Sequence, residues 1–291
     1  MATLCGCGDD AGGTAGTAGT AGTAGTAGTS GTIVRTVSVE FSNLETLGEG
    51  YVYEGWLMVD GTPQSAGRFN IDGNGGATTA SQTITEDQFE GATKYILTIE
   101  PETGDDPAPS DVHVLAGDFA NGEAALSVSA PEALNTDFST IAGAFVLGTP
   151  SDGAAPPELG IWWLDNTGVE PVAALELPTL PEGWTYEGWV VNDEGPVSTG
   201  KFLTGEGADS DGAGPAAGVE ATPPFPGQDF IDPARDLSVG YTAVISVEPV
   251  PDDSAAPFAI KPLVKAIEGT ALQSMEQNIG ANLPSGSATL Q

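Results

Sequence analysis

The sequence predicts an all-β protein in which two tandem antiparallel β-sandwich domains follow a disordered N-terminal tether. One segment, residues 44–69, recurs at 177–202 with 14 of 26 positions identical. Short runs of β-branched and aromatic residues alternate with turn residues, and helical periodicity is almost absent, which favours sandwiches. By contrast, residues 11–32 are little more than repeated Thr-Ala-Gly. Such a composition cannot build a core and is typical of a flexible linker.

The duplication defines the two domains. Its offset is a constant 133 residues, so Tyr53-Glu54-Gly55-Trp56 corresponds to Tyr186-Glu187-Gly188-Trp189. A later block, 97–101, corresponds to 245–249, and paired aspartates and a proline follow both. Two blocks in the same order indicate a repeated domain. We therefore predict a lipobox and linker at 1–31, a first sandwich at 32–135, and a second at 136–291 with a Gly/Ala/Pro-rich insertion near 205–228.

The strongest local pattern in each copy is a hairpin. Residues 51–59 are rich in aromatic and aliphatic side chains, end at Asp60-Gly61 and are followed by a second run over 64–71. A turn dipeptide between two such runs is typical of a β-hairpin. In the second copy, the runs at 185–191 and 197–203 predict the same hairpin. The best helical candidate, 271–279, is weak.

The charge of the chain excludes several kinds of partner. It has 41 acidic and 7 basic residues, a formal net charge of −34. Nucleic-acid binding requires clustered Lys and Arg, so we expect no nucleic-acid partner, and anionic membrane surfaces repel the chain. Most of the carboxylates are expected to form a hydrated surface. The domains contain no cysteine and a single histidine, His113, so we predict no cofactor and no multi-histidine or thiolate metal site.

The first residues match a lipoprotein signal. Leu4-Cys5-Gly6-Cys7 fits the lipobox pattern, in which Cys7 would receive the lipid, and the flexible linker follows at once. Only Met1-Ala2-Thr3 precede it, whereas a signal has a basic and an apolar region, so a start codon placed too late would explain the sequence. The alternative is a chance Cys-x-Cys. We predict export and lipid anchoring to the bacterial envelope, periplasmic or surface, with the lipid as the only membrane contact.

Aromatic residues supply the candidate core and a candidate surface. The duplicated aromatics are expected to fill the sandwiches: Tyr53, Trp56, Phe69, Tyr186, Trp189 and Phe202. Adjacent residues of a strand face opposite sides, so one of Trp162 and Trp163 would be exposed. Together with Trp184, these tryptophans are the best sequence hint of a binding surface.

The acidic residues suggest structural roles. Glu54 and Arg68, like Glu187 and Lys201, lie on the two arms of the duplicated hairpin and predict a cross-strand ion pair. Glu100 and Glu248 end a β run before a proline and are expected to cap backbone amides. No catalytic residue is predicted, because no Ser-centred elbow, phosphate loop or dinucleotide fingerprint is present.

Two Asp-rich loops are weak calcium candidates. They follow equivalent strands and partly resemble calcium loops, but neither has the downstream bidentate Glu, so ordinary turns are the preferred interpretation. The residues concerned are Asp72, Asn74, Asp209 and Asp211.

The duplicated blocks resemble the extracytoplasmic C-terminal domain of anti-sigma-K factors. That family has a Leu-Pro-x-Leu-Pro-x-Gly-x-x-Tyr-x-x-Trp strand, a Pro-Val-Ser-x-Gly-x-Phe strand and a Glu-Pro segment ending in prolines. Residues 177–189, 196–202 and 100–109 stand at the matching places. The resemblance implies Ig-like sandwiches outside the cytoplasm. It covers only the sensor-side module, without the sigma-binding and transmembrane parts, so sigma-factor inhibition is not implied.

The sequence as a whole predicts a non-catalytic envelope lipoprotein that binds or senses an unknown envelope ligand or protein. Two alternatives stay open. The chain could be a regulatory partner of an extracytoplasmic sigma/anti-sigma system, which a neighbouring sigma-factor gene would support. It could also be a carbohydrate-active or carbohydrate-binding surface protein, which would need exposed aromatics and a cleft.

Overall fold

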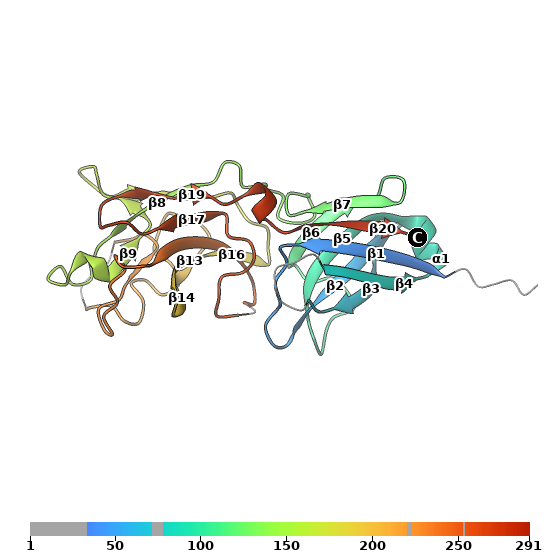
Figure 1. The fold of residues 1–291 in the computed structure, drawn as a ribbon, viewed down its shortest axis with the longest axis horizontal. Coiled ribbons are helices and arrows are strands. Elements are labelled where there is room, and N and C mark those ends of the chain that lie inside the picture. The colour runs from blue at the N-terminus through green and yellow to red at the C-terminus, as the bar shows by residue number, and fades with distance from the viewer. Residues whose placement is uncertain (1–33, 72–77, 220–222, 253) are drawn as a thin grey trace, which may run out of the picture. The chain divides into compact units, whose positions relative to one another are not determined.

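The computed structural model describes residues 34–291 except 72–77, 220–222 and 253, and strands account for most of its regular structure (Figure 1). The predicted all-β class is confirmed. The one α-helix of the described residues, α1 (Glu86–Gly91), begins at a capping box in which Thr85 and Gln88 bond each other reciprocally. None of the helices described is long and apolar enough to cross a membrane.

The first copy is built on an eight-stranded antiparallel sheet in the order β3-β2-β5-β6-β7-β20-β1-β4. The alternating burial of β1, in which Val37, Val39 and Phe41 face the core, shows one face packed and the other towards solvent. The strands are β1 (Arg35–Ser42), β2 (Tyr51–Val59), β3 (Thr62–Phe69), β4 (Thr78–Ile84), β5 (Ala92–Pro101), β6 (His113–Asp118), β7 (Glu123–Ser127) and β20 (Ser285–Leu290).

The last strand departs from the predicted domain division. β20 lies between β7 and β1 in this sheet, although the sequence placed all of 136–291 in the second copy. Its segment, Ser-Gly-Ser-Ala-Thr-Leu, offers no pattern that would assign it to either copy. The pairing satisfies the backbone of β1 along its length and buries Ala288 completely, which gives the strand its place.

The second copy contains two five-stranded sheets, β14-β13-β16-β17-β19 and β12-β8-β9-β15, the latter with β18 paired to β8, and the short pair β10-β11. Residues 271–279, the weak helical candidate, contain β18 and β19, so that expectation was wrong. The elements are β8 (Ala142–Leu147), η1 (Pro157–Leu159), β9 (Gly160–Trp162), β10 (Leu164–Asp165), β11 (Val172–Ala173), β12 (Leu175–Glu176), β13 (Trp184–Asn192), β14 (Gly195–Phe202), β15 (Gly227–Asp229), β16 (Thr242–Pro249), β17 (Leu263–Ala266), β18 (Gln273–Ser274), β19 (Glu276–Gln277) and η2 (Gly280–Asn282).

The duplicated hairpins β2-β3 and β13-β14 have the same construction. Tyr53 pairs with Phe69 and Tyr186 with Phe202, with stacked rings 6.0 and 6.3 Å apart between centroids. Each tyrosine hydroxyl donates to the carbonyl at the same repeat position, Glu45 or Pro178. Five of the six predicted core aromatics are buried, and Phe69 is half-buried: Tyr53, Trp56, Tyr186, Trp189 and Phe202 are the buried five.

The predicted exposed aromatic surface is wrong. Trp162, Trp163 and Trp184 are only 1%, 0% and 3% exposed. Trp163 packs edge-on against Phe145 in the main core, and Trp162 faces the other side of the chain, as the alternation requires. That other side is covered too, because the 205–228 insertion contributes Ala213 and Ala217 to the cluster around Trp162. Trp184 lies against the ring of Phe258.

Candidate functional site

The duplicated Glu-Pro segments end in the same buried hydrogen-bond network. The indole of Trp56 donates to Thr98 (2.9 Å), as that of Trp189 does to Ser246 (2.7 Å). Each hydroxyl in turn donates to Oε1 of the glutamate two residues on. The same oxygen accepts a backbone N–H at 2.9 Å, from Ser110 to Glu100 and from Phe258 to Glu248. The predicted capping role of the two glutamates is confirmed.

The predicted cross-strand ion pairs are also present. Arg68 Nε lies 3.3 Å from Glu54 Oε2, and Lys201 Nζ lies 3.6 Å from Glu187 Oε2. Each cation also meets an aspartate of the following loop: Asp105 at 3.6 Å in the first copy and Asp252 at 2.6 Å in the second. The two copies therefore place one cation among several carboxylates at an equivalent position.

Burial raises the pKa of three of these carboxyl groups, Glu248, Glu187 and Glu100. The effect is largest at Glu248, whose pKa rises to about 7 because it is fully buried and because Glu187 and Asp252 carry like charges. Burial also raises the pKa of Glu187 and of Glu100, where hydrogen bonds from Thr98 and Ser110 oppose the shift. Glu248 Oε2 has no hydrogen-bond partner in the described chain.

A cavity of about 350 Å³ adjoins the network of the first copy. It is bounded by the segment from Glu100 to Asp111, and four of its lining residues are acidic: Glu100, Asp105, Asp106 and Asp111. The remaining walls are Pro101, Ala108, Pro109 and Ser110. We refer to these eight residues as the acidic cavity.

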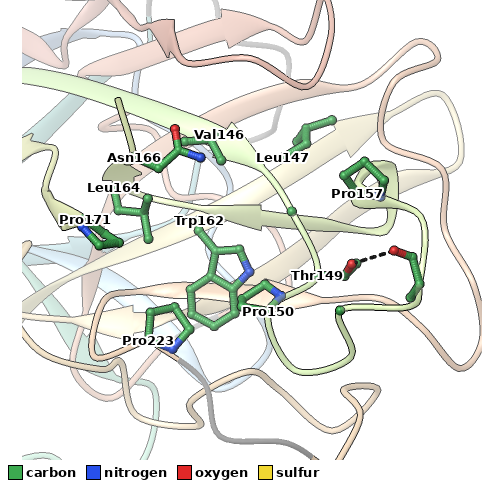
Figure 2. A pocket seen from close by; sticks show the side chains of 13 residues that line it. Val146, Leu147, Thr149, Pro150, Pro157, Trp162, Leu164, Asn166, Pro171 and Pro223 are labelled. Carbon is green, nitrogen blue, oxygen red and sulfur yellow. Dashed lines mark hydrogen bonds between the residues drawn. The ribbon is translucent and has the colours of Figure 1, made fainter. Parts of the chain in front are cut away.

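A larger cavity, about 580 Å³, lies in the second copy (Figure 2). Strands β8, β9 and β10 supply Val146, Leu147, Trp162 and Leu164, and the 148–157 loop supplies much of the rest. Figure 2 shows the indole of Trp162 beside Pro150 and Pro223. None of the described residues that line it has a charged side chain; their polar groups are the side chains of Thr149 and Asn166 and the indole N–H of Trp162. We refer to it as the apolar cavity.

Asp229 holds the wall of the apolar cavity in place. Its carboxylate is fully buried, accepts the Trp162 indole N–H at Oδ1 (2.7 Å), and accepts the Ser151 N–H (2.9 Å) and hydroxyl at Oδ2. Burial raises the pKa of Asp229, and these donors oppose that shift. One side chain of β15 thereby fixes both the indole and the loop that carries Pro150. Sequence reasoning missed Asp229, since a single Asp in a loop-rich segment gives no local signal.

Of the four weak calcium candidates, two lie outside the described residues and the other two lie close together in the insertion. Asp72 and Asn74 lie outside the described residues. Asp209 anchors the insertion, because its Oδ2 accepts the Gly227 N–H at 2.8 Å, and burial together with the charge of Asp211 raises its pKa to about 7. In the part of the chain that the structure describes, no group of three His, Cys, Asp or Glu residues could hold a metal ion.

Two predicted positions remain, His113 and Cys7. His113 is half-buried on β6, as expected, with Nδ1 2.6 Å from the carbonyl oxygen of Glu132. Cys7 lies outside the described residues.

Comparison with models of protein families gives a match to part of the chain. A model of the family described as "Anti-sigma-K factor rskA, C-terminal" matches residues 13–114. The predicted resemblance is therefore confirmed for a segment that includes the first copy of the hairpin and its Glu-Pro segment, while the likeness of the second copy rests on the internal duplication. Searches of curated proteins and of solved structures found no significant match.

Proposed function

We propose that this chain is a non-catalytic lipoprotein of the bacterial envelope that binds a small, largely apolar ligand in its apolar cavity. The observation that carries the proposal is a cavity whose described lining residues are all uncharged, in a chain of net charge −34. Its volume of about 580 Å³ lies in the range of small-molecule sites, and apolar walls with a few polar groups are typical of them. The family match supports a relation to an anti-sigma factor C-terminal domain.

The cavity has the preorganisation that a binding site requires. Trp162 is only 1% exposed and forms part of the floor, where Asp229 fixes its orientation. Proline residues at 150, 157, 171 and 223 line the cavity and restrict its backbone. A ligand entering such a site loses little affinity to ordering of the protein.

Binding can be tested with N-phenyl-1-naphthylamine, an uncharged fluorescent probe that brightens in apolar surroundings. Gly148 lines the cavity, and a Cβ added there would meet nothing within 4 Å. We expect the full chain to bind the probe saturably at one site and Gly148→Leu to abolish this binding. Gly269→Leu is the matched control, because Gly269 is equally unobstructed and lies outside the cavity. Equal binding by both variants would contradict the proposal.

Export is a separate part of the proposal and has its own test. Expression from the native locus with its upstream DNA, followed by fractionation and intact mass, is expected to give a membrane-bound product with a diacylglycerol on Cys7. The Cys7→Ser variant should be released. A soluble wild-type product without lipid would remove the envelope assignment and leave the binding proposal to be judged by the probe.

The family match favours one second function, that of a regulatory partner in a sigma/anti-sigma system. Deleting the gene should then change transcription that depends on an extracytoplasmic sigma factor, and an unchanged transcript profile would exclude the role. The carbohydrate alternative rested on exposed tryptophans, and these are buried.

A further inference from the structure

The acidic cavity of the first copy is built differently from the carboxylate-rich surface around it. Its innermost group, Glu100, is only 1% exposed although it lines the cavity. Its hydrogen bonds in the described chain, from Thr98 and Ser110, all end on Oε1. The second oxygen, Oε2, is therefore available to a ligand. A buried carboxylate with an unused acceptor is costly unless a cation or a donor meets it.

The nearest protein cation does not fill this role. Arg68 is held at the cavity's edge, with Nε 3.3 Å from Glu54 and Nη2 3.6 Å from Asp105. Its Nη1 and Nη2 also donate to the carbonyls of Glu102 and Pro101. Its donors are thus committed to Glu54 and to the rim loop. The carboxylates of Glu100, Asp106 and Asp111 have no ion pair among the described residues.

The cavity's walls distinguish between kinds of cation. A bare metal ion needs several ligand atoms close around one point, and no suitable group of three such residues is found in the described chain. The volume of about 350 Å³ exceeds what one ion requires, and Pro101, Ala108 and Pro109 add apolar surface to the lining. A lining that combines apolar and anionic groups matches a ligand whose ammonium groups are separated by methylene segments.

We propose that the acidic cavity binds an aliphatic polyamine, with one ammonium group bonded to Glu100 Oε2 and another near Asp106. The site is independent of the apolar cavity and of the proposed function. In the second copy the equivalent carboxylate, Glu248, lines neither the acidic nor the apolar cavity, so the proposal concerns the first copy.

The test is calorimetric titration of spermidine into the full chain at about 0.15 M salt, where attraction by diffuse charge is largely screened. We expect one saturable site. Glu100→Gln and Asp106→Asn should each weaken binding by about tenfold or more, since each removes a charge that meets the ligand. Asp106 is exposed, and its carboxylate accepts the Ala108 N–H, a bond that Asn retains. Asp106→Asn therefore keeps the test valid if Glu100→Gln fails to fold.

The matched control is Asp60→Asn. Asp60 is exposed at the other end of the same hairpin, and its positive φ of 50° is one that Asn adopts readily. This variant should leave the dissociation constant within about twofold of the wild-type value. An equal loss in Asp60→Asn and Asp106→Asn would show attraction by net charge and overturn the proposal, as would the absence of saturable binding. If Ca²⁺ displaces spermidine at a concentration below that at which spermidine itself binds, the site is a metal site and the polyamine proposal is overturned.

Discussion

The two copies of the duplicated hairpin share a hydrogen-bond network but differ in what surrounds its glutamate. In the first copy Glu100 lines a cavity, and the hairpin cation is Arg68. In the second, Glu248 is fully buried with an unpartnered oxygen, and the cation is Lys201. The comparison shows that both copies keep the same hydrogen-bond network, whereas the loop after the glutamate decides whether its carboxylate lines a cavity or faces the interior.

The largest effect should come from removing the hairpin cation. Lys201→Met leaves Glu187 and Asp252 without their partner beside buried Glu248. Breaking a buried pair costs about 3–5 kcal/mol, and because the Lys201 side chain is 35% exposed and partly screened by solvent, we expect a loss of about 3 kcal/mol of unfolding free energy, at the lower end of that range. Arg68→Met should cost less, about 2 kcal/mol, because the cavity beside Glu100 lets water approach. Chemical denaturation measures both values.

Lys265→Met is the control for this pair of variants. Its partners, Glu268 and Glu276, are mostly exposed, so the loss should stay below about 1 kcal/mol. Equal losses in all three variants would mean that burial of the carboxylate partner does not affect the strength of these ion pairs.

The next effect is a dependence of stability on pH. The pKa of Glu248 is raised from 4.5 to about 7 in the folded state, so the folded protein binds this proton more tightly than the unfolded chain does. The stabilisation is complete below about pH 4.5 and is lost as the pH rises through about 7, a change of about 3 kcal/mol. Glu248→Gln keeps the neutral form at every pH, so its stability relative to wild type should rise over this window.

Glu100→Gln provides the comparison between the copies, since the pKa of Glu100 is raised in the same direction. We expect the stability of Glu100→Gln relative to wild type to change less between pH 4 and pH 8 than that of Glu248→Gln, as measured by the unfolding midpoints. A steeper difference for Glu100→Gln would mean that the first copy, not the second, has the more deeply buried carboxylate.

A smaller loss of unfolding free energy is expected from Asp229→Asn, which tests whether Asp229 supports the wall of the apolar cavity. Asn can still accept the indole N–H of Trp162, but its amide NH2 cannot accept from Ser151. The loss should be about 1–3 kcal/mol of unfolding free energy, with weaker probe binding. Spermidine binding should not change, and a change there would show that the two cavities are coupled.

The smallest effects test the equivalence of the two networks. Thr98→Ser and Ser246→Thr exchange the hydroxyl residues of the two copies and keep every donor, so each should change stability by less than about 1 kcal/mol. Thr98→Val, which leaves Glu100 without that donor, should cost about 1–2 kcal/mol. A large loss in either exchange would mean that the networks are not interchangeable.

Sequence reasoning succeeded where the information is local or repeated. The hairpins, the ion pairs and the capping glutamates could be predicted because the segments 44–69 and 97–101 recur at 177–202 and 245–249. It failed for β20, which pairs with β1 although the two strands lie at opposite ends of the described chain. It also failed for Trp162, which was expected at the surface and is buried.

The two cavities escaped prediction for a similar reason. The walls of the apolar cavity come from separate loops around Pro150, Pro171 and Pro223, so no single stretch carries its pattern. The acidic cavity is local to 100–111, but in a chain with 41 acidic residues its carboxylates gave no distinct signal. Burial of Glu100, which distinguishes them, is visible only in the structure.

The most direct test of the proposed function is the titration of full-length protein and of Gly148→Leu with N-phenyl-1-naphthylamine. Our account predicts saturable binding at one site in the wild type and in Gly269→Leu, and none in Gly148→Leu. Saturable binding that persists in Gly148→Leu, or no binding by the wild type, would contradict the assignment of the apolar cavity as the ligand site.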